Sequence, residues 1–142
     1  MAEQILAVKE KQQVINMVLG LGVDIIEINR IEKSISKFGD QFLNKVFTKN
    51  EIKYCNPKPN KYQHYAARFA AKEAIAKALS YSGEEGFSWQ DIEIYNEKNG
   101  LPKAILFNKM KDILGEDKQI LISMSHSDNY VSCVAILQQR SN

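Results

Sequence analysis

The stretch Gly20-Leu21-Gly22-Val23-Asp24-Ile25-Ile26-Glu27 is the most informative segment of the sequence for the fold. As a strand, it gathers apolar side chains on one face, namely Leu19, Leu21, Val23 and Ile25. The opposite face carries Gly20, Gly22 and Asp24. Glycine gives a strand nothing to pack, so two glycines beside one acid indicate close approach by a ligand or by another backbone. Asp24 could hold a metal ion or a proton, or it could be an exposed acid at the start of a Gly-rich strand.

A second segment, Tyr65 to Leu79, consists of strong helix formers without glycine or proline. On this helix, Glu73 and Lys77 fall on one face together with Ala66 and Ala70. A stripe of small residues runs beside them: Ala67, Ala71, Ala74 and Ala78. The charged pair is either a solvated salt bridge beside a tightly packed row of alanines, or a functional pair next to space that the small side chains leave open.

Taken together, Gly20 to Ile28 and Arg68 to Ala78 resemble the two signature blocks of the holo-acyl-carrier-protein synthases. These enzymes are the short-chain class of 4′-phosphopantetheinyl transferases. Three further blocks agree in the family's order: Phe87 to Ile94, Asn99 to Pro102 and Ile122 to Ser127. The likeness runs from about Met17 to Leu137. Five blocks in the right order are hard to obtain by chance, so the resemblance is specific.

The resemblance implies a transferase that moves the 4′-phosphopantetheine group of coenzyme A to a serine of apo acyl carrier protein. The products would be the holo carrier and adenosine 3′,5′-bisphosphate, in support of fatty acid biosynthesis. The family further implies a homotrimer with active sites in clefts between neighbouring subunits. A carrier-binding module without catalysis and a generic Mg²⁺-dependent phosphoesterase are the two rival function classes.

The motif match carries the family's metal role to Asp24 and Glu73. Mg²⁺ suits this role, because it is a hard cation usually bound through one or two carboxylates, with waters and phosphate oxygens completing its shell. Glu73, or a water that it holds, could take the serine proton. Lys77 lies one helical turn beyond Glu73 and could offset charge on the departing phosphate or protonate it.

The match also implies coenzyme A contacts outside these two segments. Ser125 and His126 are assigned to a phosphate of coenzyme A, and Asn99, Gly100 and Pro102 to the loop that contacts the nucleotide. Without the resemblance, these positions would be an exposed hairpin tip and a plain hairpin turn. His64 matches no motif and is expected to be structural.

A cationic stripe, Arg30, Lys33 and Lys37, runs along the helix expected after the first strand. On its own it could be an ordinary solvated face. In the resembling family this helix holds the acidic recognition helix of the carrier protein. Lysine stands here where relatives often carry arginine, which leaves fewer bidentate contacts.

Composition limits the remaining possibilities. The chain has 142 residues with 25% charged and 44% hydrophobic residues, as expected of one globular domain that oligomerisation could supplement. A formal charge of +2 is too small to indicate nucleic acid as a partner. Cys55 and Cys133 are expected to be reduced thiols. No apolar run is long enough for a membrane span or a signal peptide, so a cytoplasmic protein is expected.

The expected fold class is α+β, with a small antiparallel sheet packed on the long helix. Residues 1–16 form an N-terminal extension and residues 17–142 the transferase domain. The expected helices are Arg30 to about Phe47, weakened at Gly39, a short helix after the capping box Thr48 to Glu51, the Ala-rich helix, and Phe107 to Leu114. The expected strands after the first are Asp91 to Tyr95, Leu101 to Leu106, Gln119 to Ser125 and Tyr130 to Leu137.

One departure from the family's pattern lies after Lys77-Ala78. Relatives commonly have a glycine two or three residues later that lets coenzyme A approach, whereas this chain has Leu79-Ser80 and reaches glycine only at Gly83. The path of this loop and its adenine contacts are therefore left open.

Overall fold

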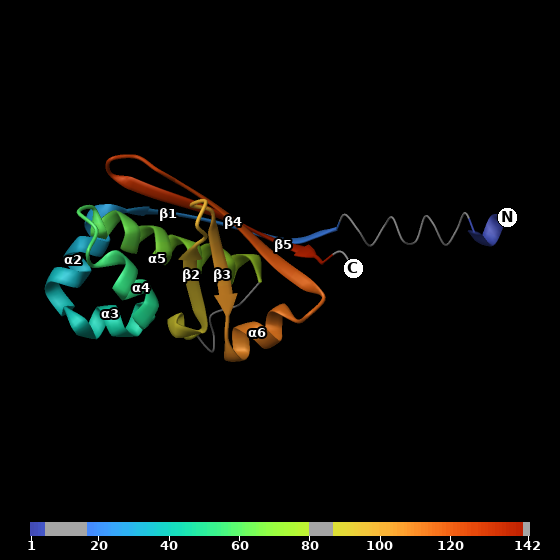
Figure 1. The fold of residues 1–142 in the computed structure, drawn as a ribbon, viewed down its shortest axis with the longest axis horizontal. Helices are drawn as coiled ribbons and strands as arrows, with labels where there is room; N and C mark the ends of the chain where they lie inside the picture. Colours follow the sequence, from blue (N-terminus) through green and yellow to red (C-terminus); the bar gives the residue numbers. More distant parts are fainter. Residues whose placement is uncertain (5–16, 80–86, 141–142) are drawn as a thin grey trace.

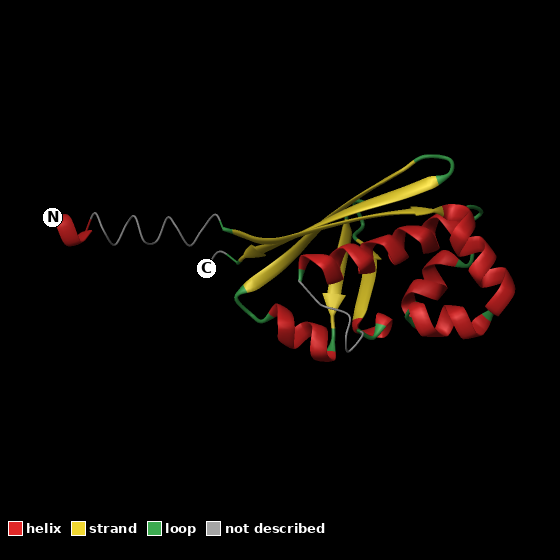
Figure 2. Cartoon of the chain, turned by 180° about the vertical axis from the view of Figure 1, so that it is seen from behind, coloured by secondary structure: helices red, strands yellow, loops and turns green. Residues whose placement is uncertain are grey.

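The computed structural model describes residues 1–4, 17–79 and 87–140 of the chain. Its centre is the long helix α5 (Lys61–Ala78), which lies along a three-stranded sheet and also contacts β2 (Figures 1 and 2). The helices α2 to α4 gather at one end of α5, and α6 lies toward the other. The predicted α+β class is confirmed.

The main sheet is antiparallel with the strand order β1-β5-β4, from β1 (Val18–Glu27), β5 (Tyr130–Gln139) and β4 (Lys118–His126). A separate two-stranded sheet pairs β2 (Ile92–Asn96) with β3 (Pro102–Leu106). The predicted strands all exist, but they divide into two sheets instead of one. His126 is the last residue of β4 and precedes the hairpin turn at residues 127–129.

The helix expected from Arg30 to about Phe47 is wrong as one element. It is two helices, α2 (Ile28–Phe38) and α3 (Asp40–Val46), because Gly39 between them has φ 55° and ψ −134°, a conformation that only glycine adopts easily. The capping box that begins α4 (Lys49–Cys55) is confirmed. Thr48 Oγ1 accepts from the Glu51 amide at 3.2 Å, and Glu51 Oε1 accepts from the Thr48 amide at 2.8 Å.

Helix α5 is buried on nearly all sides. It starts at Lys61, four residues before the predicted start, and Ala66 and Ala70 are completely buried, as are Ala71 and Ala74. The expectation that the small residues near Glu73 and Lys77 leave open space beside the pair is therefore wrong. Small side chains are needed here because the sheet and the smaller helices pack on α5 from several directions.

Gly20 and Gly22 allow strand β1 to pack directly on the backbone of α5. A Cβ atom at Gly22 would lie 1.9 Å from the carbonyl oxygen of Ala74, and one at Gly20 would lie 2.0 Å from that of Ala78. Of the two alternatives left open by the sequence, close approach by another backbone is the correct one. This contact brings the strand that carries Asp24 onto the helix that carries Glu73.

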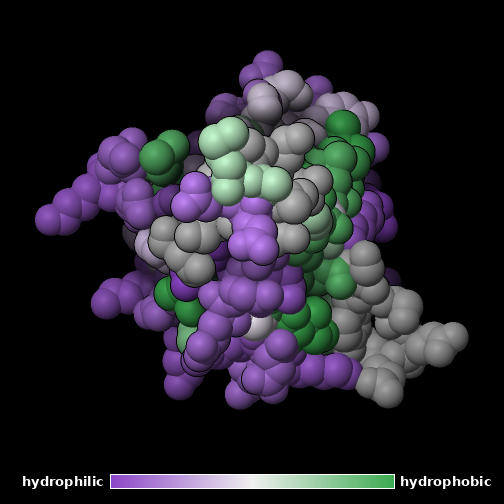
Figure 3. Space-filling view, turned by 90° about the vertical axis from the view of Figure 1, so that its right-hand side faces the viewer, coloured by the Kyte–Doolittle hydropathy of each residue, from purple (hydrophilic) through white to green (hydrophobic). Residues whose placement is uncertain are grey.

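The two faces of the main sheet differ in exposure. The face toward α5 is core, with Val131, Cys133, Ala135 and Leu137 between 0% and 7% exposed. The other face leaves Leu21 and Ile25 of β1 65% and 66% exposed. Figure 3, a view of one end of the molecule, shows hydrophobic atoms in a band along one side and hydrophilic atoms over much of the rest.

The remaining elements are the 3₁₀ turn η1 (Trp89–Asp91) and α6 (Asn108–Leu114), which ends at Gly115 as predicted. Cys55 and Cys133 are buried and free. The loop after Ser80 and most of the N-terminal extension lie outside the described residues. Within the described part of the chain, no helix has the length and apolar character needed to cross a membrane.

Candidate functional site

Asp24 of β1 meets Lys77 of α5 at the edge of the strand and helix contact. Lys77 Nζ donates to the carbonyl oxygen of Val23 at 2.8 Å and to Asp24 Oδ1 at 3.3 Å. Among the ion pairs of the described residues, Lys77 is paired with Asp24 and not with Glu73. The salt bridge between Glu73 and Lys77 that helical spacing suggested is therefore not formed, and the lysine instead links helix to strand.

Glu73 lies close enough to Asp24 for the two carboxylates to repel each other. Burial raises the pKa of Glu73, Asp24 raises it further, and Lys77 opposes both effects. The described residues hold no cluster of three or more His, Cys, Asp or Glu side chains that could bind a metal ion. The two carboxylates nevertheless fit Mg²⁺, whose remaining ligands are commonly water and phosphate oxygens.

Only one strip of the C-terminal half of α5 is open. Between Arg68 and Leu79, every residue is buried except Phe69, Glu73 and Lys77, which recur at four-residue spacing. A molecule that reacts at Glu73 can therefore lie along this strip. Asp24 borders the strip from β1, with a side chain that is 18% exposed.

The hairpin between β2 and β3 is tied to α5 through Arg68. Arg68 Nη2 donates to Asn96 Oδ1 at 3.0 Å, and Asn96 Nδ2 donates to the carbonyl oxygen of Gly100 at 3.2 Å. Asn99 closes the turn by accepting from the Leu101 amide at 3.1 Å, and Gly100 has φ 88°. The hairpin prediction is confirmed, and Asn99 and Gly100 are exposed at its tip.

Arg68 belongs to a group of basic side chains around the ring of Tyr54. The Arg68 guanidinium carbon lies 4.3 Å from the ring centroid and Lys58 Nζ lies 4.6 Å from it, while the His64 ring packs edge-on at 5.6 Å. Arg68 is 1% exposed, and its Nε has no hydrogen-bond partner among the residues that the structure describes. No carboxylate among the described residues forms an ion pair with Arg68.

The same basic group extends toward the end of β4. Burial lowers the pKa of His64, and Arg68, Lys58 and His126 lower it further. His126 and Ser125 are both exposed. Within the described part of the chain, neither forms a hydrogen bond or an ion pair with Asp24, Glu73 or Lys77. Among the described residues, the site of Asp24, Glu73 and Lys77 is thus separate from the basic side chains around Tyr54.

The cationic stripe of α2 is exposed, as predicted for Arg30, Lys33 and Lys37. Lys33 and Lys37 line an open groove of about 620 Å³ together with Asn29, Glu32 and Ser36. The stripe faces solvent along one side of α2, whereas Ile31 on the other side is only 2% exposed and anchors the helix in the core.

Comparison with known proteins identifies the family. Residues 20–135 match the family model of the 4′-phosphopantetheinyl transferase superfamily. The chain belongs to this superfamily. It is 46% identical over 120 residues to the holo-[acyl-carrier-protein] synthase of Protochlamydia amoebophila, covering 84% of this chain and 98% of that one. The family and the transferase activity predicted from the sequence are confirmed.

Solved structures of this family have the same fold. The holo-(acyl-carrier-protein) synthase of Bacillus anthracis in complex with CoA (3′,5′-ADP) matches with a TM-score of 0.73 and 31% identity, over 88% of this chain and 100% of that one. The Helicobacter pylori synthase in complex with coenzyme A matches with a TM-score of 0.73 and 29% identity, over 83% and 99% of the two chains.

Sequence reasoning did not single out Arg68 as a functional residue, although Arg68 lies within a signature block. No signal in the sequence indicates its burial, because Lys77 stands in the same run of small helix residues and is exposed. Nothing in the spacing along α5 shows that Lys58, His64 and His126 gather near it.

Proposed function

We propose that this protein transfers the 4′-phosphopantetheine group of coenzyme A to a serine of apo acyl carrier protein. The products are the holo carrier and adenosine 3′,5′-bisphosphate, made in the cytoplasm for fatty acid biosynthesis. The observation that carries the proposal is the meeting of Asp24, Glu73 and Lys77 at one open strip of α5. The names of the relatives and the coenzyme A complexes of the neighbours support the same substrates.

Asp24 and Glu73 are the proposed ligands of Mg²⁺. Their mutual repulsion supports this role, because a cation between them would remove the cost of two ionised carboxylates at one place. When bound, Mg²⁺ would neutralise charge on the pyrophosphate of coenzyme A. The raised pKa of Glu73 also suits a base, so Glu73 or a water that it holds takes the proton of the attacking serine.

Lys77 is proposed to act on the leaving group. Its side chain is 54% exposed and its amine is held beside Asp24, so the amine can reach a phosphate bound on the open strip. A cation there offsets the charge that grows on the departing adenosine bisphosphate or protonates it. This contribution is largest in the transition state, when the phosphorus to oxygen bond is breaking.

Coenzyme A is proposed to contact the hairpin residues Asn99, Gly100 and Pro102, and Ser125 and His126 at the end of β4. Arg68 is proposed to support this site from within the core. Its guanidinium is buried and forms no ion pair with a carboxylate of the described residues, so its positive charge, together with that of Lys58, would favour a phosphate bound at the surface nearby.

Docking of the carrier is proposed at Arg30, Lys33 and Lys37 of α2. The three cations are exposed on one side of a core-anchored helix, and Lys33 and Lys37 border an open groove, which supports contact with an acidic helix of the carrier. Such contacts increase the association rate more than they increase affinity.

A homotrimer is proposed as the working assembly. The outer face of the main sheet exposes a continuous apolar surface, formed by Leu21, Val23, Ile25, Leu121, Val134 and Ile136. A surface of this kind is normally covered in solution, and packing copies of the sheet around one axis would cover it. Part of each coenzyme A pocket would then come from the neighbouring subunit.

The test is incubation of the chain with coenzyme A, Mg²⁺ and apo carrier protein, read by mass spectrometry of the carrier. A mass gain of one phosphopantetheinyl group is expected for the wild type. Asp24→Ala and Glu73→Ala should lower the rate by orders of magnitude while leaving the fold intact. Carrier that is bound but never modified would favour the binding module, and hydrolysis of coenzyme A without transfer would favour the phosphoesterase.

A further inference from the structure

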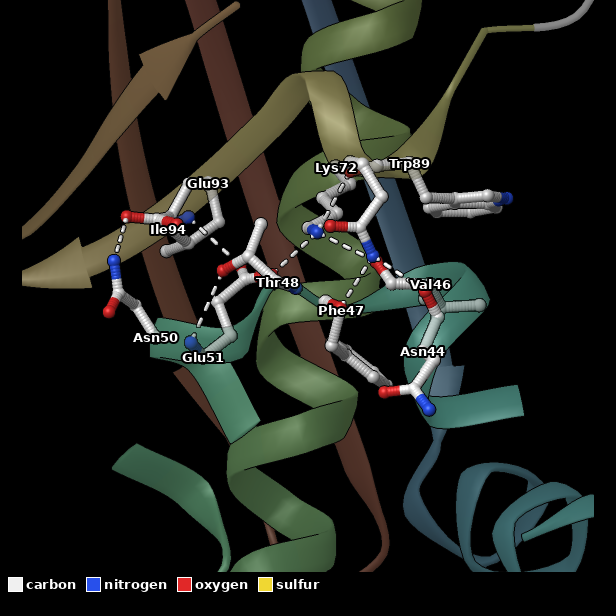
Figure 4. Close-up of polar contacts among 11 residues, drawn as sticks. Asn44, Val46, Phe47, Thr48, Asn50, Glu51, Lys72, Trp89, Glu93 and Ile94 are labelled. Atoms are coloured by element: carbon white, nitrogen blue, oxygen red, sulfur yellow. Dashed lines mark hydrogen bonds and ion pairs between the residues drawn. The ribbon is translucent and has the colours of Figure 1, made fainter. Parts of the chain in front are cut away.

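Lys72 precedes Glu73 on α5, and its amine is completely buried. Lys72 Nζ donates three hydrogen bonds: to Glu51 Oε1 at 2.6 Å, to the carbonyl oxygen of Val46 at 2.7 Å and to that of Trp89 at 3.0 Å. The side chains of Lys72 and Glu51 are both 0% exposed. Figure 4 shows the amine pointing into this ring of acceptors. All three donors of the ammonium group are therefore used.

Glu51 is equally saturated. Its Oε1 also accepts from the Thr48 amide at 2.8 Å, and its Oε2 accepts from the Ile94 amide at 2.9 Å. The ion pair thereby joins the end of α3, the start of α4, the middle of α5, η1 and β2 at one point (Figure 4). A buried ion pair adds little net stability compared with apolar side chains of similar volume, so overall stability alone does not account for this one.

The hydrogen bond from Lys72 to the Trp89 carbonyl oxygen connects Lys72 to the open strip of α5 through the Trp89 side chain. The Trp89 ring stacks on Phe69 with the ring centroids 4.8 Å apart and the planes 24° apart, and Phe87 packs on Trp89 at 4.9 Å. Phe69 lies one helical turn before Glu73 on the same strip. The backbone that Lys72 holds therefore carries the aromatic side chain that borders the strip next to Glu73.

We propose that Lys72 is a positioning residue for phosphopantetheinyl transfer. Through its bonds to Glu51 and to the Trp89 carbonyl, it fixes the stacked pair Trp89 and Phe69 beside Glu73, and so fixes the shape of the strip along which the substrates meet. The inference rests on the proposed function for its catalytic consequence. The tether itself is a property of the fold that can be measured without any activity.

The test uses fluorescence, because Trp89 is the only tryptophan of the chain. In Lys72→Met, we expect Trp89 emission to shift to longer wavelength and to become easier to quench with acrylamide. Turnover should fall about 10- to 100-fold, because misplacement by about 1 Å costs this much, while KM for the carrier should change less than about threefold. Asn50→Ala is the matched control: Asn50 neighbours Glu51 but bonds Glu93, and its loss should change neither signal.

The double variant Lys72→Met with Glu51→Gln separates positioning from stability. Lys72→Met alone leaves the buried carboxylate of Glu51 without its cation and should lower the melting temperature. The double variant removes both charges and should recover much of the lost melting temperature. It does not restore the bond to Trp89, so turnover should stay low and the emission shifted. Recovery of turnover together with the melting temperature would overturn the proposal, as would wild-type emission in Lys72→Met.

Gln90→Ala keeps the test decisive if Lys72→Met does not fold. Gln90 is exposed, and its Nε2 donates to the carbonyl oxygens of Asn44 at 2.7 Å and Phe47 at 2.6 Å, holding the same turn from its outer side. This variant should give smaller changes of the same sign, and unchanged emission and turnover would overturn the proposal. A wild type without transferase activity would refute the proposed function, and the fluorescence would still decide on the tether.

Discussion

The contact between Gly22 and α5 can be broken with a single methyl group. In Gly22→Ala, the new Cβ would lie 1.9 Å from the carbonyl oxygen of Ala74 and 2.9 Å from the amide nitrogen of Ala78. An ordinary carbon to oxygen contact is about 3.3 Å, so strand and helix must separate by roughly 1.4 Å. Both nearby atoms belong to the backbone of a buried helix, and neither can move as a side chain would.

The displacement should affect stability and catalysis together. Overpacking of this kind costs about 1–3 kcal/mol, which corresponds to a fall in melting temperature of about 3–10 °C for a chain of this size. Ala74 follows Glu73 directly, so moving this part of α5 away from β1 also moves Glu73 away from Asp24. A shift above about 1 Å should lower turnover by about 100-fold or more.

Gly39→Ala is the control for lost stability. Gly39 has a positive φ but no atom within 4 Å of a Cβ placed there, so alanine would strain the backbone without moving a neighbour. We expect a loss of about 1–3 kcal/mol with turnover at about 25 °C within about threefold of the wild type. Thermal melts and the carrier modification assay measure both effects. Turnover of Gly22→Ala near the wild-type value would refute the view that this packing contact sets the site.

The other predictions concern docking, assembly and the carboxylates. Lys33→Glu with Lys37→Glu should weaken carrier binding, mainly by lowering the association rate, and should leave coenzyme A binding unchanged; added salt should lower the same rate in the wild type. Stopped-flow measurements of binding check this prediction, and an equal loss of affinity for both substrates would point to misfolding. Val134→Glu should abolish assembly and activity together in light scattering and assay, and a fully active monomer would contradict both the trimer and the shared site. Glu73 has a raised pKa, so its protonated form favours folding, and this stability is present below the ordinary glutamate pKa and lost as pH rises through the raised one. Without Mg²⁺, the melting temperature of Glu73→Gln should therefore be no lower than that of the wild type at about pH 7, and the difference between the two melting temperatures should shrink toward about pH 5. Only the wild type should gain stability from added Mg²⁺, and an equal gain in both proteins would argue against the ligand role of Glu73.

The sequence by itself determined the family, the fold class and most helices and strands. Local signals were enough for these elements, because a capping box, a hairpin turn at Asn99 and Gly100 and a glycine at the end of α6 each act through their own neighbours. The resemblance covered five short blocks and needed no knowledge of distant contacts. The meeting of Asp24 with the α5 face was expected from the family alone.

Tertiary structure decided what lies against what. Gly20 and Gly22 indicated a close approach, but only the packed fold showed that the approaching group is the backbone of α5, since spacing along one segment does not identify its partner. The pairing of Lys77 with Asp24 and the burial of Lys72 depend on which side of α5 meets the sheet, which is decided by the packing of the whole core. The basic group around Tyr54 likewise joins residues from α4, the following loop, α5 and β4, whose proximity is a property of the folded chain.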